Sequence, residues 1–293
     1  MKIAIYSESK GKVTHNVVLK LFDFKNKYSI DFTFETTFHN SLKKNFDFKK
    51  DCKTFSSKKE LNNSYDLMIT IGGDGTLLRS IRFIEDLEIP VIGINTGRLG
   101  FLATLSQDLL KSKIEKILKK EFKVEKRSLL AVEFEKDEIN NDFKYALNEI
   151  SVSRKNTTSM IKIKTNLNRE FLNSYWADGL IISTPTGSTG YSMSCGGPIM
   201  SPQSKTLALT PIAPHNLNAR PIIIPDNTLI ELCVTGREKN HLLSLDSKII
   251  SLKNGTLMKV KKADFKIKIA HLLEDNFYKT LRSKLLWGED KRN

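Results

Sequence analysis

The residues with the clearest chemical potential form a glycine-rich turn around one carboxylate, Gly72-Gly73-Asp74-Gly75-Thr76. An apolar, β-branched run at 65–71 precedes this turn and predicts a buried strand. Apolar residues at helical spacing over 77–84 follow it and predict a helix. Glycines at such a junction let backbone N–H groups approach an anionic phosphate closely. The alternative is a plain strand-to-helix turn in which Asp74 serves only as an N-cap.

Arg79 falls in the first turn of the predicted helix, next to the glycine-rich turn. At that position it adds a positive charge that would favour a bound phosphate. An ordinary surface arginine would have the same sequence context, so both interpretations stay open.

A second segment with chemical potential covers residues 183–198 and is dense in small hydroxyls and glycines. It contributes little to an apolar core but offers many hydrogen bonds, and Tyr191 offers a ring face to a base. Asp178 lies just before it, and an earlier strand-like run is interrupted by Asn148-Glu149. An amide beside a carboxylate suits a base edge and ribose hydroxyls. A long turn and a solvent-facing polar pair are the alternatives for these two features.

The elements that position the first turn predict an α/β domain over residues 1–122. Strand patterns at 2–6, 28–35, 65–71 and 89–94 alternate with helical patterns, which is typical of a parallel sheet. Ligands of such sheets bind beyond the carboxyl ends of the strands, where the 72–76 turn lies. No G-x-G-x-x-G follows the first strand, so the usual dinucleotide fingerprint is absent.

Beyond residue 122 the pattern changes to short alternating strands separated by turn residues. This pattern predicts an all-β, sandwich-like domain over 123–270. Residues 271–293 return to helical spacing, and we expect this terminal helix to bury its apolar stripe against the first domain.

Composition excludes several classes of protein. The 293 residues include 40% apolar ones, enough for a sizeable core, and three widely spaced cysteines that provide no disulfide framework or metal-ligand spacing. The net charge of +14 comes from lysines spread over nearly every segment without interleaved aromatics, so we expect no nucleic-acid partner. No apolar run has the length of a membrane span, and residues 1–6 resemble a strand more than a signal peptide. We therefore expect a cytoplasmic protein without a membrane partner.

Taken together, the chain resembles the NAD kinases. The likeness rests on segments in a fixed order, which are 72–76, 95–102, 148–149, 178–198, 209–215 and 218–221. The first segment alone is weak evidence, because lipid kinases and phosphofructokinases carry similar turns, whereas the full set is highly specific. Gly190 departs from the pattern, since many relatives have alanine there. No motif is identified in 26–64.

The resemblance implies a two-domain enzyme that transfers the γ-phosphoryl group of ATP to the 2′-hydroxyl of the adenosine ribose of NAD. Asp74 would be the general base, and Gly72, Gly73, Gly75 and Thr76 would form the phosphate-binding turn. A divalent metal, Mg²⁺ carried by ATP, and a homodimer or homotetramer are also implied. The implied substrate-binding residues are Gly75, Arg79, Phe101, Asn148, Glu149, Asp178, Thr189, Gly190, Tyr191, Ser192, Met193, Ser194 and Lys248.

Two rival functions remain at this point. A lipid or sugar-phosphate kinase would use the same turn but would not explain Asn148-Glu149 together with 189–194. A non-catalytic nucleotide sensor would bind NAD without turnover, but it would have no need of the carboxylate of Asp74.

Overall fold

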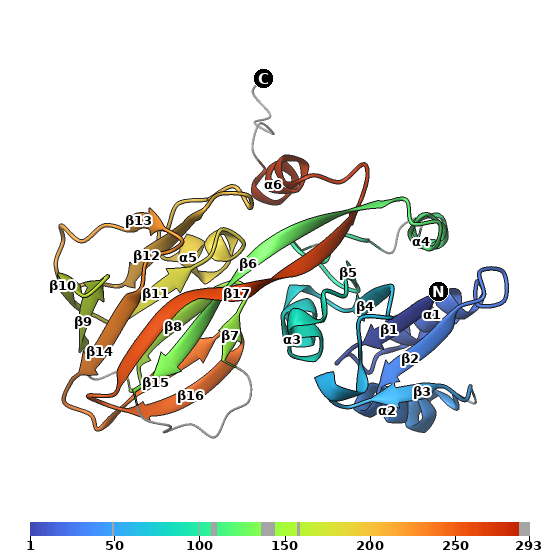
Figure 1. The fold of residues 1–293 in the computed structure, drawn as a ribbon, viewed down its shortest axis with the longest axis horizontal. Helices are drawn as coiled ribbons and strands as arrows, with labels where there is room; N and C mark the ends of the chain where they lie inside the picture. The colour runs from blue at the N-terminus through green and yellow to red at the C-terminus, as the bar shows by residue number, and fades with distance from the viewer. Residues whose placement is uncertain (49, 99, 107–109, 136–143, 157–158, 287–293) are drawn as a thin grey trace. The chain divides into compact units, whose positions relative to one another are not determined.

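A computed structural model describes residues 1–48, 50–98, 100–106, 110–135, 144–156 and 159–286 (Figure 1). The chain divides into two compact units. The N-terminal unit contains residues 1–126 and 266–293, and the β unit contains residues 127–265.

The N-terminal unit is built on a parallel sheet in the order β3-β2-β1-β4-β5. The end of the long strand β17 (Leu257–Leu272) joins this sheet, where Ile269 pairs in parallel with Val91. The carboxyl ends of all these strands therefore lie at the same edge of the sheet. The five strands are β1 (Lys2–Tyr6), β2 (Asp31–Glu35), β3 (Lys53–Phe55), β4 (Leu67–Ile71) and β5 (Val91–Ile94).

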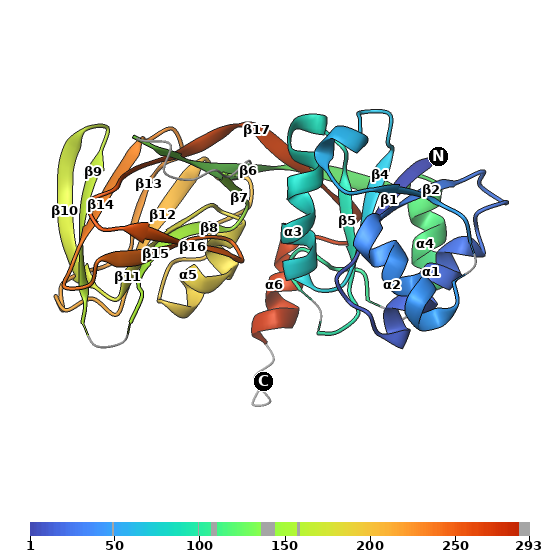
Figure 2. The ribbon, with the colours of Figure 1, turned by 90° about the horizontal axis from the view of Figure 1, so that it is seen from below.

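Helices cover both faces of this sheet. One face packs its buried side chains, such as Ile3 and Ile5, against α1, α2 and α4. The other face receives α3, whose Phe83 contacts the ring of Tyr6 at 5.3 Å, and Figure 2 shows these helices on opposite sides of the strands. The helical segments of this unit are α1 (Lys12–Phe22), α2 (Thr36–Phe46), η1 (Lys58–Glu60), α3 (Asp74–Ile84), η2 (Glu85–Leu87), α4 (Leu110–Leu118) and α6 (Phe277–Leu285).

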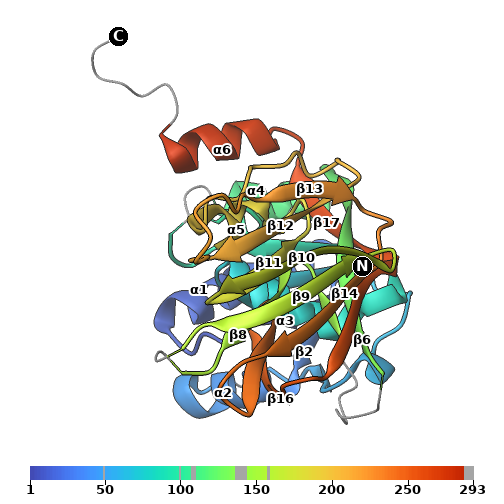
Figure 3. The ribbon, with the colours of Figure 1, turned by 90° about the vertical axis from the view of Figure 1, so that its left-hand side faces the viewer.

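The β unit is a sandwich of two antiparallel layers. A six-stranded sheet in the order β13-β12-β11-β8-β15-β16 shares one buried core with the strands β10-β9-β14-β17. Figure 3 shows β10, β9 and β14 side by side at the outside of the second layer. The remaining strands are β6 (Phe122–Phe134), β7 (Tyr145–Ala146), β8 (Glu149–Arg154), β9 (Ile161–Leu167), β10 (Glu170–Ala177), β11 (Gly179–Ser183), β12 (Thr206–Ile212), β13 (Ile222–Pro225), β14 (Ile230–Thr235), β15 (Asn240–Leu245) and β16 (Lys248–Lys253).

The predicted fold class is confirmed, including the parallel α/β domain, the sandwich and a C-terminal helix that groups with the N-terminal unit. The polar stretch 36–64, which carried no clear pattern, forms α2, β3 and η1. The short strands predicted up to residue 270 end with β17, which has 16 residues and continues to Leu272. The two compact units of the structure meet at 126/127 and 265/266. The domain boundaries predicted at 122/123 and 270/271 stay predictions.

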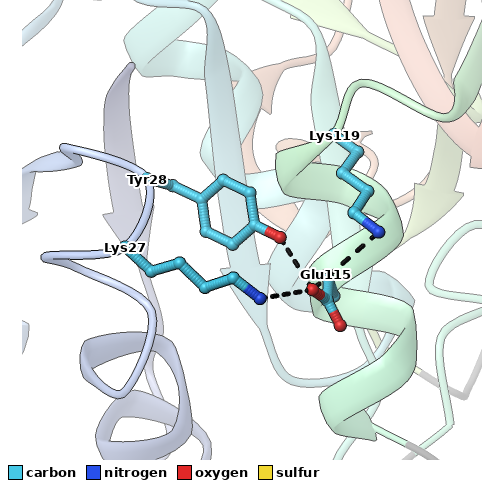
Figure 4. Close-up of polar contacts among 4 residues, drawn as sticks. All are labelled: Lys27, Tyr28, Glu115 and Lys119. Carbon is cyan, nitrogen blue, oxygen red and sulfur yellow. Dashed lines mark hydrogen bonds and ion pairs between the residues drawn. The ribbon is translucent and has the colours of Figure 1, made fainter.

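Several lysines in or just after α4 form ion pairs with acids of the N-terminal unit. Glu115 accepts Lys27 Nζ at 2.7 Å and the hydroxyl of Tyr28 at 2.8 Å, and Lys119 lies 3.9 Å from the same oxygen (Figure 4). Ion pairs with Asp23, Glu274 and Asp66 hold the further lysines Lys111, Lys116 and Lys120. This part of the positive charge therefore stabilises local packing of the N-terminal unit. Among the described helices, none is long and apolar enough to cross a membrane.

Candidate functional site

The glycine-rich turn stands at the carboxyl end of β4, where α3 begins at Asp74. Gly72 has a positive φ of 154°, and a Cβ there would lie 2.3 Å from the hydroxyl oxygen of Thr76. Only glycine fits this position. A Cβ on Gly73 would meet no atom within 4 Å, so the turn is open on that side. Strand, turn and helix thus follow the order that the sequence predicted.

The carboxylate of Asp74 is held by a loop that follows β5. Oδ2 accepts the backbone N–H of Phe101 at 2.8 Å, and Oδ1 accepts those of Leu102 at 3.1 Å and Ala103 at 2.8 Å. A carboxylate has about four lone-pair positions, so these bonds leave one for a further donor. Asp74 is half-buried. The arrangement fixes the orientation of the carboxylate while keeping it accessible.

Gly100 allows this contact, although the sequence did not single it out. A Cβ at position 100 would lie 1.8 Å from Oδ1 of Asp74, which no real structure tolerates. In the same loop, Asn95 donates its amide to the carbonyl oxygens of Arg98 and Ala103 and accepts the N–H of Gly97. Residues 95–103, apart from Leu99, which lies outside the described residues, therefore form a hydrogen-bonded loop that holds Asp74 and is called the cradle below.

Arg79 lies over the turn and forms an ion pair with Glu8 in the loop after β1. Its guanidinium nitrogens lie 3.4 and 3.5 Å from the position that a Cβ on Gly75 would take. The side chain is therefore beside the turn, and a carboxylate holds its charge in place. Its role in binding phosphate remains a prediction.

In the β unit, the predicted pair Asn148-Glu149 lies at the start of β8 and is held by Asp246. This carboxylate accepts the backbone N–H groups of Leu147 at 2.8 Å, Asn148 at 2.8 Å and Glu149 at 3.0 Å. In return, the N–H of Asp246 donates to the carbonyl of Glu149 at 3.0 Å. Asp246 thus positions both predicted ligand-binding residues, and sequence reasoning missed it.

Two side-chain oxygens at this place are buried without a hydrogen-bond partner, Oδ1 of Asn148 and Oε2 of Glu149. Burial, with a contribution from the neighbouring Asp246, raises the pKa of Glu149 to about 8. Burial also raises the pKa of Asp246 to about 6, against the opposite effect of its three N–H donors. Unpaired buried oxygens are costly, so these two are candidates for contact with a ligand.

The hydroxyl-rich segment packs against this pair. Thr184 donates its N–H to the carbonyl of Asn148 at 2.9 Å and its hydroxyl to the carbonyl of Leu147 at 2.6 Å. A Cβ on Gly187 would lie 2.1 Å from the carbonyl oxygen of Asn148, and one on Gly190 would lie 3.0 Å from Oε2 of Glu149. A methyl group at position 190 would therefore face the carboxyl of Glu149.

The remaining predicted residues of this segment form η3 (Gly187–Thr189) and the short helix α5 (Tyr191–Ser194). Tyr191 is 48% exposed, so its ring is available to a ligand. Ser192 is buried and its hydroxyl bonds to that of Thr210 at 2.9 Å. Met193 is half-buried and Ser194 is exposed.

Two other predicted residues lie at strand ends. Asp178 stands between β10 and β11 and pairs with Arg154 at 2.8 Å. Lys248 pairs with Leu245 across the hairpin whose two-residue turn contains Asp246. The hairpin therefore brings Lys248 close to the residue that holds 147–149.

The structure thus brings the predicted residues together as two sets. Asp74, the glycine turn, Arg79 and Phe101 lie in the N-terminal unit, and Asn148, Glu149 and the 187–194 segment lie in the β unit. Sequence reasoning missed Gly100 and Asp246. It also missed Glu8, which pairs with Arg79, and Arg154, which pairs with Asp178. The only available signal for Asp246 was its place two residues before Lys248.

Within the described ranges, no group of three or more His, Cys, Asp or Glu side chains is arranged to hold a metal ion. Mg²⁺ is usually held by substrate phosphates and water with one or two carboxylates, so an ion carried by a nucleotide fits this donor set.

Two family models match the chain. The ATP-NAD kinase N-terminal domain matches residues 6–122, and the ATP-NAD kinase C-terminal domain matches residues 147–272. Among curated proteins, the NAD kinase of Flavobacterium psychrophilum is 52% identical over 100% of both chains. The NAD kinase of Bacteroides fragilis is 41% identical, again over 100% of both chains.

Two solved structures share the fold. The yeast NADH kinase complexed with NADH has a TM-score of 0.87 at 24% identity, covering 99% of this chain and 89% of that one. An NAD kinase from Archaeoglobus fulgidus in complex with ATP has a TM-score of 0.74 at 23% identity, covering 98% and 99%.

Proposed function

This chain belongs to the ATP-NAD kinase family and is a kinase, and from that premise we propose that it transfers the γ-phosphoryl group of ATP to the 2′-hydroxyl of the adenosine ribose of NAD. The observation that carries this proposal is the carboxylate of Asp74, oriented by three backbone N–H groups beside an open glycine turn. A lipid or sugar-phosphate kinase would leave the buried, unpaired oxygens of Asn148 and Glu149 unexplained.

In the proposed reaction, the 2′-oxygen forms a bond to the γ-phosphorus and the bond from that phosphorus to the bridging oxygen of ADP breaks. Asp74 takes the proton of the hydroxyl through its remaining lone-pair position. Phosphoryl transfer depends mostly on in-line positioning and charge neutralisation, and a base contributes about 10²–10⁴-fold. The first-turn N–H groups of α3 and the charge of Arg79 favour the phosphates.

We assign the dinucleotide to the residues of the β unit. The unpaired oxygens of Asn148 and Glu149 are placed to accept hydrogen bonds from an adenine amine and from ribose hydroxyls. The exposed ring of Tyr191 offers a stacking surface to the base. Asp178, Thr189, Gly190, Ser192, Met193, Ser194, Lys248 and, from the N-terminal unit, Gly75 and Phe101 complete the proposed set of substrate contacts.

Mg²⁺ belongs to this proposal as an ion brought by ATP, which supplies charge neutralisation at the phosphates when bound. The cytoplasmic location and the homodimeric or homotetrameric state are also proposals. Light scattering of the purified protein tests the oligomeric state, and cell fractionation tests the location.

Purified protein incubated with ATP, Mg²⁺ and NAD tests the activity directly. We expect NADP to form, detected by a dehydrogenase that accepts only NADP, with one ADP released per NADP. Phosphorylation of a lipid or sugar phosphate in place of NAD would favour the first rival. NAD binding by calorimetry without any NADP would favour the nucleotide sensor.

A further inference from the structure

An ion pair in the β unit joins a proposed substrate contact to a residue that has no part in the steps described above. Nη2 of Arg154, at the end of β8, lies 2.8 Å from Oδ2 of Asp178, which stands between β10 and β11. The side chains are 27% and 26% exposed, so most of the pair is shielded from water. Charges attract more strongly where water is partly excluded than on the open surface. Arg154 therefore restrains the carboxylate of Asp178.

The backbone of Asp178 is held independently of this ion pair. The N–H of Arg154 donates to the carbonyl of Asp178 at 2.9 Å, and the N–H of Asp178 donates to the carbonyl of Ile212 at 2.9 Å. A Cβ on Gly179 would lie 2.4 Å from the carbonyl oxygen of Val152, so the chain after Asp178 packs directly on β8. Replacing the side chain of Arg154 therefore releases the carboxylate and leaves these backbone contacts in place.

Asp178 faces the part of the β unit that carries the proposed stacking ring. Burial, with contributions from Cys195 and from the charge of Asp178, raises the pKa of Tyr191. Because the interaction between charges falls off with distance, this contribution indicates that the carboxylate and the phenol are neighbours. The carboxylate that Arg154 holds thus belongs with the residues assigned to the dinucleotide.

The charge balance of this site gives Arg154 a second effect. Within the β unit, the residues assigned to the dinucleotide include two acids, Glu149 and Asp178, and one cation, Lys248. Burial raises the pKa of Glu149 to about 8, which keeps a proton on that carboxyl at neutral pH. The diphosphate of NAD is anionic, and a carboxylate without a counter-charge at its binding site would repel it. Arg154 supplies the counter-charge of Asp178.

We infer that Arg154 is a positioning residue for NAD, because its guanidinium holds Oδ2 of Asp178, offsets its charge and leaves Oδ1 to contact the dinucleotide. The inference rests on the proposed function and adds a residue that acts through Asp178. Arg154 takes no part in the transfer of the phosphoryl group. Its loss therefore changes the affinity for NAD and leaves kcat and the KM for ATP near their wild-type values.

Titration of NAD in the calorimeter, without ATP, tests the effect on binding. Arg154→Met keeps much of the length of the side chain and removes its charge, and we expect the Kd and the KM for NAD to rise about tenfold. Arg154→Lys keeps the charge without the planar fork, so its Kd should lie between those of Arg154→Met and the wild type. Lys262→Met is the matched control and should bind NAD as the wild type does, since it removes another 2.8 Å ion pair of the β unit, that with Asp226.

A double variant shows whether Arg154 acts through Asp178. Once Asp178→Asn has removed the charge that Arg154 holds, adding Arg154→Met should raise the Kd by less than about twofold. Circular dichroism checks folding, and the same comparison can be made with Arg154→Lys if Arg154→Met does not fold.

An unchanged Kd in Arg154→Met would overturn the inference. Full multiplication of the two effects in the double variant would also overturn it, because Arg154 would then act without Asp178. An equal loss in Lys262→Met would do the same by assigning the effect to the stability of the unit. All these outcomes are read from NAD binding alone, whereas a wild-type protein that binds NAD and makes no NADP would overturn the proposed function itself.

Discussion

Asp74 in the N-terminal unit and Asp246 in the β unit each accept three backbone N–H groups from a short loop distant in the sequence. The distances are 2.8–3.1 Å for Asp74 and 2.8–3.0 Å for Asp246. The surroundings differ. Asp74 stands beside a glycine turn that is open at Gly73, while Asp246 has a carboxyl group buried enough to raise its pKa to about 6.

The same hydrogen-bond pattern therefore serves two purposes. In the N-terminal unit the backbone holds the carboxylate, which stays accessible to a substrate. In the β unit the carboxylate holds the backbone of Asn148 and Glu149, the two residues proposed to contact the dinucleotide. Four substitutions separate these roles, and the first should change turnover most.

Replacing Asp74 by Asn keeps the size of the side chain and removes the proposed base, and, as at Asp246, it leaves at least one of the N–H groups of 101–103 without its acceptor. We expect kcat for NADP formation to fall about 10²–10⁴-fold, because a positioned general base contributes that much. The affinity for NAD in calorimetry should stay within about threefold of the wild type, since the dinucleotide contacts are assigned mainly to the β unit. Asp23→Asn, at a surface ion pair with Lys111, is the control. Near-normal turnover in Asp74→Asn would contradict the role of Asp74 as the general base.

Replacing Gly100 by Ala tests whether the cradle of Asp74 matters as much as its charge. The added Cβ would lie 1.8 Å from Oδ1, so the carboxylate or the loop must move. A displacement near 1 Å can cost about 10²-fold in rate, and we expect a loss of kcat of that order. Gly97→Ala is the control in the same loop, where the nearest atom to a Cβ is 4.0 Å away. Equal activity of Gly100→Ala and Gly97→Ala would contradict the proposal that the cradle positions Asp74 for turnover.

Replacing Asp246 by Asn should act on binding more than on turnover. An amide offers one acceptor oxygen in place of two, so at least one of the N–H groups of 147–149 loses its partner, at a cost of about 1–3 kcal/mol. We expect the KM for NAD to rise about tenfold with a smaller change in kcat, together with a lower melting temperature. Ser247→Ala in the same turn is the control. A loss confined to kcat would place Asp246 with Asp74 instead.

Replacing Glu149 by Gln should change how stability depends on pH. Burial raises the pKa of Glu149 from 4.5 to about 8, so the folded protein keeps a proton that the unfolded chain releases. Stability therefore falls as the pH rises from 4.5 to 8. We expect Glu149→Gln to melt higher than the wild type at pH 8, by about 2–4 °C for each kcal/mol that the wild type has lost, and to match it near pH 4, below the ordinary pKa of 4.5. The same difference in melting temperature at both pH values would contradict its assignment to the raised pKa of Glu149.

Much of this protein follows from local sequence patterns. The strand, glycine turn and helix around Asp74, the parallel character of the first sheet and the short strands after residue 122 all follow from periodicity and turn residues. The candidate residues Asp74, Asn148 and Glu149 were recognisable because their neighbours in the sequence form motifs. Residues 36–64 were not predicted, because α2 and β3 carry short, polar patterns that only packing on the sheet turns into regular structure.

Only the tertiary structure decided which groups meet. Asp246 lies 97–99 residues from the N–H groups that it accepts, and Asp74 lies 27–29 residues from its own. No local pattern encodes such a pair, because it depends on which strand ends come together when the sheets form. The ion pair between Arg154 and Asp178 has the same origin. Sequence alone determined the elements and the chemical groups, and folding determined which of those groups share a site.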